Sequence, residues 1–166
     1  LILGPEMKST GEVMGIDGTF LSAFAKSQIA CGTILPLEGK VFISVDDYNK
    51  KFILKIVKKL INLNFMIVAT KGTSKYLNEN NLKAETINKV KEGGPHIVDA
   101  IKKNKIDLVI NTTKTQGSIR DSYSIRRTSL TYNIPYYTTI AGAKIAVDTI
   151  EHLKNNRLKV KSLQDL

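Results

Sequence analysis

Residues 65–74 read Phe-Met-Ile-Val-Ala-Thr-Lys-Gly-Thr-Ser, and this stretch determines the fold that we expect. The first five residues are apolar without polar alternation, which is typical of a strand that is covered on both faces. Gly72 then lets the backbone turn tightly, and a helix begins at Thr73 or Ser74. A buried strand that leads through a polar loop into a helix indicates an α/β protein with a parallel sheet.

The same alternation of strand and helix continues on both sides of this stretch. Short apolar runs predict further strands at residues 41–45, 84–87, 107–110, 134–138 and 158–163. Helical spacing predicts helices at 17–30, 118–132 and 140–154, and a short helix within 70–80. Two more helices are expected to begin after Asp46 or Asp47 and at Pro95, and Asp17 is expected to cap the first helix. We expect the helix at 118–132 to turn Ile119, Tyr123 and Leu130 inward. The alternation predicts a three-layer α/β/α fold with a central, mostly parallel sheet, of the Rossmann or flavodoxin-like kind.

Composition limits the class of protein. The chain has 166 residues, enough for one domain with a core, and its formal net charge is +10. The lysines are spread along the chain without a block of like charges, which argues against nucleic acid as a partner. No apolar run reaches the roughly 18 residues of a membrane helix, and no signal peptide is visible, so we expect no membrane partner. The single cysteine, Cys31, favours a reducing, cytoplasmic compartment.

Polar side chains gather where the predicted parallel strands end. The carboxyl ends of such strands meet at one edge of the sheet, where ligands bind in open α/β folds. The loops at this edge contain Ser44, Lys50, Thr70-Lys71-Gly72-Thr73-Ser74, Asn88-Lys89-Val90 and Asn111-Thr112-Thr113. Free backbone N–H groups at the start of the helix near Gly72 favour an anion such as a phosphate.

Simpler interpretations of the same residues remain open. The run Thr-Lys-Gly-Thr is also typical of a threonine-capped helix, and Asn111-Thr112-Thr113 of a polar turn that closes a buried strand. None of the loop residues is a good nucleophile or general base, so the pattern predicts binding and no catalytic residue. His96 and His152 lack the spacing of metal ligands, so we expect no metal site.

Several motifs resemble one enzyme family over nearly the whole chain. Residues 5–15, Pro-Glu-Met-Lys-Ser-Thr-Gly-Glu-Val-Met-Gly, resemble the end of the second ATP-binding half of the carbamoyl phosphate synthetase large subunit. Five further motifs resemble the C-terminal allosteric domain of the bacterial type of this subunit. They are Ala69-Thr70-Lys71-Gly72-Thr73, Asn88-Lys89-Val90, Gly94-Pro95-His96-Ile97, Ile110-Asn111-Thr112-Thr113 and Ile125-Arg126-Arg127. The resemblance implies a methylglyoxal-synthase-like regulatory domain at residues 36–166. Residues 1–35 would then be the tail of the preceding ATP-binding synthetase domain and a linker.

The resemblance also implies a function. Bacterial members of the family bind the nucleotides UMP and IMP in this domain, which regulates an ATP-dependent ligase. That enzyme makes carbamoyl phosphate from glutamine or ammonia, bicarbonate and two ATP, with Mg or Mn, for pyrimidine and arginine biosynthesis. This chain would hold no cofactor of its own. Its partners would be the nucleotide effectors, the rest of the large subunit, the glutaminase small subunit and other copies of itself.

Matching the family position by position implies a set of effector contacts. The phosphate contacts would be Lys50, Thr70, Gly72, Thr73 and Lys89. The ribose or base contacts would be Ser44, Asn111, Thr112, Thr113 and Asp121. The chain departs from the family at the ornithine site, because Tyr136-Tyr137-Thr138 stands where the family has Tyr-Asp-Thr.

The missing aspartate weakens the case for ornithine, whose side-chain ammonium needs a carboxylate. We therefore expect Tyr136 and Thr138 to be a remnant of that site and Tyr137 to pack in a strand with a solvent-facing hydroxyl. The alternative function is that of a methylglyoxal synthase-type phosphate lyase. That enzyme has Gly-Gly-Asp where this chain has Gly93-Gly94-Pro95, and the loss of a carboxylate base argues against catalysis.

Overall fold

Five parallel strands form the centre of the molecule. The computed structural model describes residues 11–112, 116–160 and 162, and for residues 116–121 the backbone alone. The sheet has the order β3-β2-β1-β4-β5, and every neighbouring pair is parallel. The strands are β1 (Lys40–Ser44), β2 (Met66–Thr70), β3 (Glu85–Ile87), β4 (Leu108–Asn111) and β5 (Tyr136–Tyr137). The expected parallel α/β architecture is confirmed.

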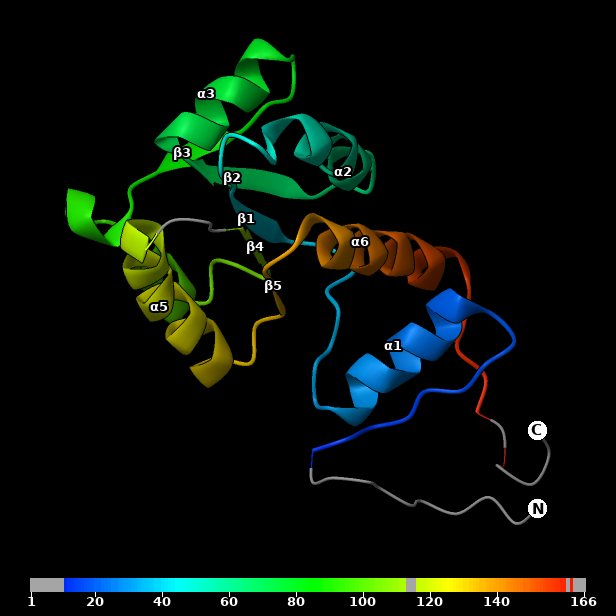
Figure 1. The fold of residues 1–166 in the computed structure, drawn as a ribbon. Helices are drawn as coiled ribbons and strands as arrows, with labels where there is room; N and C mark the ends of the chain where they lie inside the picture. Colours follow the sequence, from blue (N-terminus) through cyan, green and yellow to red (C-terminus); the bar gives the residue numbers. More distant parts are fainter. Residues whose placement is uncertain (1–10, 113–115, 161, 163–166) are drawn as a thin grey trace.

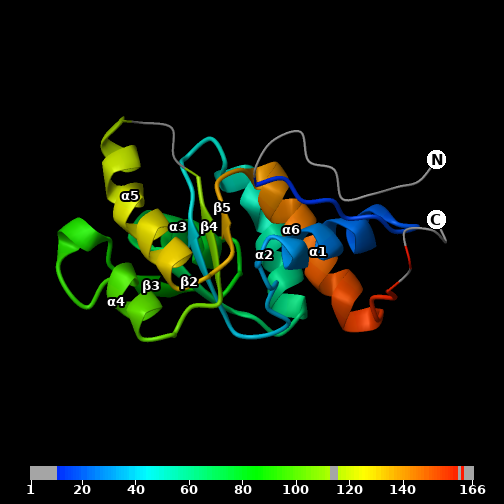
Figure 2. The same cartoon turned by 90° about the horizontal axis from the view of Figure 1, so that it is seen from below.

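Helices cover both faces of this sheet and make three layers (Figures 1 and 2). They are α1 (Phe20–Ala30), α2 (Lys50–Asn62), α3 (Lys71–Glu79), the 3₁₀ helix η1 (Val90–Glu92), α4 (Ile97–Lys102), α5 (Gln116–Thr131) and α6 (Ile140–Asn155). One face packs against α2, α3 and α6, and the other packs against α4 and α5. In the described part of the chain, no helix is both long and apolar enough to cross a membrane.

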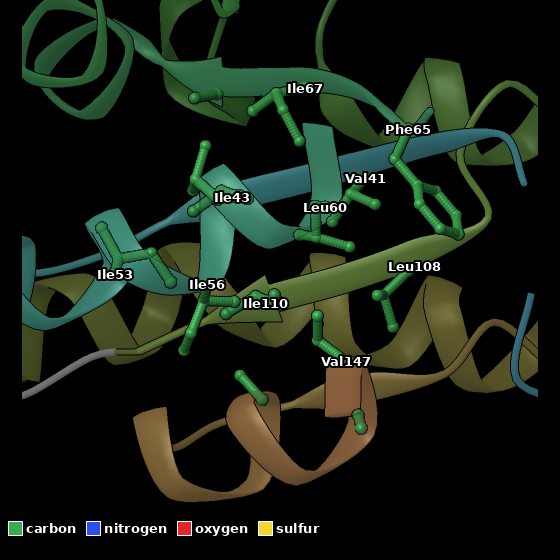
Figure 3. Close-up of a cluster of buried hydrophobic side chains, with 14 of the residues drawn as sticks. Val41, Ile43, Ile53, Ile56, Leu60, Phe65, Ile67, Leu108, Ile110 and Val147 are labelled. Carbon is green, nitrogen blue, oxygen red and sulfur yellow. The ribbon is translucent and has the colours of Figure 1, made fainter. Parts of the chain in front are cut away.

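Two apolar clusters hold the layers together. Successive side chains of a strand point to opposite faces, so Val41 and Ile43 of β1 join one cluster while Phe42 joins the other. Figure 3 shows the larger cluster, where Ile53, Ile56 and Leu60 of α2 pack onto β1 and β4. Full burial of one such side chain contributes about 1.5–3 kcal/mol, so these residues stabilise the packing of α2 on the sheet.

Helix starts differ from the expectations in four places. α3 begins at Lys71, directly after β2, so Gly72 lies within the helix and does not form a turn before a start at Thr73 or Ser74. The side chain of Thr19, and not Asp17, caps α1. Asn49 stands at the N-cap of α2, because Asp46 and Asp47 lie in the loop before it. Pro95 precedes α4, whose N-cap is His96; the ring of His96 accepts a hydrogen bond from the backbone of Asp99.

Two further expectations were wrong. Tyr123 and Leu130 do not point inward, because their side chains are 66% and 64% exposed, and Ile125 and Ser129 are buried instead. The side chain of Ile119 lies outside the described residues. In the described part of the predicted strand at 158–163, residues 158–160 and 162 are neither helix nor strand. Val160 is 97% exposed there.

The helix that precedes the predicted domain boundary packs on the sheet domain. α1 lies alongside α6 in both views (Figures 1 and 2). The buried Ser22 lies 2.8 Å from Nε2 of His152, and this hydrogen bond joins the two helices. Gly15 lets the chain before α1 run close against it, because a Cβ at this position would meet the carbonyl oxygen of Ala23.

Candidate functional site

The strands end side by side at one edge of the sheet. Ser44 is the register partner of Asn111, and Thr70 is the partner of Ile87, so the ends of four strands lie in one row. The order of the sheet reverses at β1, because β2 and β3 lie on one side of it and β4 and β5 on the other. Ligands of open α/β sheets bind beyond such a reversal point.

Three hydroxyl groups converge between β1 and β2. Oγ1 of Thr70 lies 3.4 Å from Oγ of Ser44 and 3.3 Å from Oγ1 of Thr73. Oγ1 of Thr73 also accepts a 3.3 Å hydrogen bond from the backbone N–H of Val45. Thr70 and Thr73 are only 3% and 1% exposed, so the protein itself fixes the orientation of these hydroxyls.

The start of α3 differs from the starts of two other helices with a threonine N-cap. The side chains of Thr19 and Thr139 accept hydrogen bonds of 3.2 and 3.0 Å from the backbones of α1 and α6. Thr70 makes no such capping bond at α3. The threonine-capped helix, which was the simpler interpretation, is therefore wrong here. The first N–H groups of a helix have no partner within it, so α3 presents donors and a positive dipole end at this edge.

The flanking lysines are placed differently from one another. Lys50 begins α2, and its ammonium lies 2.6 Å from the carboxylate of Asp47 and 5.8 Å from the centre of the Tyr76 ring on α3. The hydrogen bond to Lys50 lowers the pKa of Asp47 below its usual range. Lys89 follows β3 and has an exposed side chain. Gly72 lies in the first turn of α3, and a Cβ there would meet nothing within 4 Å.

A carboxylate that the sequence pattern did not single out lies between β1 and β4. Asp46 accepts hydrogen bonds from the backbone of Asn49 at 3.1 Å and from its side chain at 2.6 Å. It also accepts a 3.1 Å bond from the hydroxyl of Thr112. Since Thr112 is itself held by Ser44 through a backbone bond of 2.9 Å, the loop after β1 and the end of β4 form one unit. The sequence pattern places Asp46 only before the helix that follows it.

The two tyrosines of β5 serve different neighbours. The hydroxyl of Tyr136 accepts a 2.8 Å hydrogen bond from the side chain of Asn111, and burial raises the pKa of Tyr136. The hydroxyl of Tyr137 donates to Gln28 of α1, and burial, with a smaller contribution from Cys31, raises its pKa to about 12. The expected solvent-facing hydroxyl of Tyr137 is therefore wrong. Thr138 follows β5 and is exposed.

The polar groups at the carboxyl ends of the strands are chemically suited to an anion and to a polar group beside it. Among the predicted contacts, Ser44, Lys50, Thr70, Gly72, Thr73, Asn111 and Thr112 lie around it, and Lys89 stands beyond β3. Thr113 and the side chain of Asp121 lie outside the described residues. Among the residues that the structure describes, no three His, Cys, Asp or Glu side chains form a group that could hold a metal ion.

The family of this chain follows from its sequence. The family described as "MGS-like domain" matches residues 52–138, which is more than half of the chain. The chain belongs to the MGS-like domain family. This MGS-like domain also shares its fold with a methylglyoxal synthase from Elizabethkingia anophelis NUHP1. The TM-score is 0.52 over 68% of this chain and 79% of that chain, at 17% identity.

Curated relatives of this MGS-like domain are much longer chains. It is 50% identical over 165 residues to the carbamoyl phosphate synthase large chain of Mesorhizobium japonicum, and 51% identical over 165 residues to that of Myxococcus xanthus. The matched region covers 99% of this chain but only 14% and 15% of the two relatives. The chain is also 49% identical to a Methanopyrus kandleri protein named as the C-terminal section of that large chain. The match covers 31% of that protein.

Proposed function

We propose that this chain is the effector-binding domain of a longer carbamoyl phosphate synthase large chain and binds a nucleoside monophosphate, such as UMP or IMP. The observation that carries the proposal is the start of α3, whose N-cap Thr70 leaves the first amides of the helix uncapped. The hydroxyls of Ser44, Thr70 and Thr73 converge beside it. A phosphate monoester has the charge and the acceptor oxygens that fit this set.

In this proposal the phosphate and the nucleoside of the bound nucleotide lie at different sides of the sheet edge. The phosphate lies on the amides around Gly72 and Thr73, and Lys50 and Lys89 add charge. The hydroxyl of Thr70 donates to the phosphate by turning away from Ser44 and Thr73. To reach the phosphate, Lys50 leaves its ion pair with Asp47, which is cheap because that carboxylate is 93% exposed. The ribose and base lie toward β4, near Ser44 and Asn111. Thr113 and Asp121 would add contacts to the ribose or base, as the resemblance implies.

In the whole protein, the bound effector changes the activity of an ATP-dependent ligase that makes carbamoyl phosphate from glutamine. ATP with Mg or Mn, and the glutaminase subunit, act outside this domain, and the compartment is the cytoplasm. Coupling between two such sites is typically about 1–3 kcal/mol and is reciprocal, so ATP also changes the affinity for the effector. Ornithine is not an effector in this proposal, because Tyr137 provides a phenol that is already bonded to Gln28.

Calorimetric titration of the chain with UMP, IMP and uridine tests the proposal. We expect a nucleotide to bind and uridine to bind far more weakly, because the phosphate supplies the charged contacts. Lys89→Ala should weaken nucleotide binding by about 1.5–3 kcal/mol, the contribution of a charged hydrogen bond. Lys102→Ala, which removes an exposed lysine of α4, is the matched control. Equal affinity for UMP and uridine would contradict the proposal.

The phosphate lyase alternative is less well supported. The similarity to methylglyoxal synthase, at 17% identity, concerns the fold alone. Gly94 is followed by Pro95 and not by an aspartate, and the carboxylate in the first turn of α4, Asp99, already accepts a hydrogen bond from the backbone N–H of His96. Incubation of the chain with dihydroxyacetone phosphate should therefore release no phosphate above the uncatalysed rate.

A further inference from the structure

The reversal point of the sheet is bridged by hydrogen bonds within the protein. After β1 the chain turns to α2 on one face, and after β4 it continues to α5 on the other (Figures 1 and 2). A separation of this kind opens a crevice between two strands, which is where ligands of such folds bind. Here Asp46 and Thr112 meet across the crevice at 3.1 Å. The carboxylate therefore occupies the place where a ligand is expected.

Thr112 has no hydrogen-bonding capacity left for a ligand. A threonine hydroxyl has one donor and two acceptor positions. Oγ1 of Thr112 donates to Oδ2 of Asp46, accepts from the backbone N–H of Asp46 at 3.4 Å and accepts from Nδ2 of Asn49 at 3.3 Å. All three positions are used inside the protein. Thr112 thus holds the two loops together instead of facing a nucleotide.

Asp46 keeps an acceptor at the same place. Its Oδ2 accepts from Asn49 and Thr112, whereas its Oδ1 accepts only the backbone N–H of Asn49 among the described residues. Each carboxylate oxygen has two lone pairs, so Oδ1 can accept one more hydrogen bond. Asp46 is only partly buried, and a ligand at the edge can reach it. A group that meets this carboxylate must donate, because an ionised carboxylate only accepts.

The two sides of this edge therefore differ in their hydrogen-bonding groups and charge. Amides of α3 and hydroxyls lie between β1 and β2, and a carboxylate lies between β1 and β4. Only Val45 separates Ser44 from Asp46, and the N–H of Val45 is bonded to Thr73. A phosphate is favoured on the first side and repelled on the second, whereas the hydroxyls of a ribose are suited to the second side.

We propose that Asp46 determines specificity at this site by accepting a hydrogen bond from a ribose hydroxyl of the bound nucleotide. The inference rests on the proposed function, since it concerns the same nucleotide. It assigns to Asp46 a ribose contact that the position-by-position match did not place there. The selected ligands are ribonucleoside monophosphates, in preference to their deoxy counterparts.

Calorimetric titration with UMP, 2′-deoxy-UMP and 3′-deoxy-UMP tests the inference, with the corresponding inosine nucleotides as a second series. The wild type should bind the monophosphate about 10-fold or more tightly than at least one deoxy counterpart, the contribution of a hydrogen bond to a charged group. Asp46→Asn should reduce this ratio to about threefold or less. Asp47→Asn, which removes an exposed carboxylate one residue further on, should leave the ribose-to-deoxyribose ratio unchanged.

The outcomes separate this inference from the proposed function. If Asp46 only supports the loop, Asp46→Asn weakens all ligands by the same factor, and the unchanged ratio overturns the inference. Equal affinity of the wild type for the ribonucleotide and both deoxynucleotides also overturns the inference. This result needs no variant, so the inference can be tested even if Asp46→Asn does not fold. In both cases a nucleotide still binds and still depends on Lys89. If neither UMP nor IMP binds the wild type, the proposed function and this inference fall together.

Discussion

The phenol of Tyr137 donates a hydrogen bond of 3.1 Å to Oε1 of Gln28, which joins β5 to α1 across 109 positions of the chain. The adjacent Tyr136 accepts a bond from Asn111, at the edge where we propose that the nucleotide binds. Neighbouring side chains of a strand point to opposite faces, so these two residues connect β5 to the site on one side and to α1 on the other. α1 therefore has a fixed position relative to the sheet.

The first prediction concerns this hydrogen bond. Tyr137→Phe should lower the free energy of unfolding by about 1 kcal/mol, because it removes the bond and keeps the packing of the ring. Urea denaturation measures the change. In a Gln28→Ala background the same substitution should cost clearly less, since the partner is already gone. An equal cost in both backgrounds would show that the bond does not contribute to stability.

The second prediction concerns alkaline pH. The pKa of Tyr137 is raised to about 12 by burial and, to a smaller extent, by Cys31, whereas an unfolded tyrosine titrates near pH 10. Above pH 10 the unfolded state releases this proton first, so the contribution of Tyr137 is complete below pH 10 and is lost as the pH rises toward 12. The wild type should be about 1 kcal/mol more stable than Tyr137→Phe at pH 8, and this advantage should disappear near pH 11. Because lysines titrate in both proteins, only the difference between the two is informative.

The third prediction uses two glycines of the segment before α1. A Cβ on Gly15 would collide with the carbonyl oxygen of Ala23 and the backbone nitrogen of Ser27, whereas one on Gly18 would meet nothing within 4 Å. Gly15→Ala should destabilise the protein by about 1–3 kcal/mol, because backbone must move to make room. Gly18→Ala is the matched control and should change stability by much less. Thermal unfolding of both variants measures the difference, and equal melting temperatures would contradict the packing of this segment on α1.

The strands at the centre of the sheet were predictable because burial on both faces leaves a continuous apolar run. The sequence around Ile43, Val68 and Val109 shows this directly, and all three side chains are buried. The orientation of α5 was not predictable in the same way. Its apolar residues are sparse, so several helical faces are nearly equivalent in the sequence, and contact with α4 selects the one that carries Ile125.

The site shows the same division between local and distant determinants. The start of α3 directly after β2 is visible in the sequence because the apolar strand, Gly72 and the threonines are neighbours in the chain. The bond between Asp46 and Thr112 joins residues that are 66 positions apart, and the pattern around neither residue indicates it. For this reason the sequence indicated the polar ends of the strands but not the position of Asp46 beside Thr112.

The most direct test of the account is a ¹H–¹⁵N NMR titration of the chain with UMP and IMP. We predict that the largest chemical-shift changes occur at the backbone amides of Lys71, Gly72 and Thr73, with further changes at Lys89, because the phosphate accepts hydrogen bonds from the start of α3. Saturating changes confined to other parts of the molecule, or no changes at either nucleotide, would contradict the claim that this helix start binds the effector.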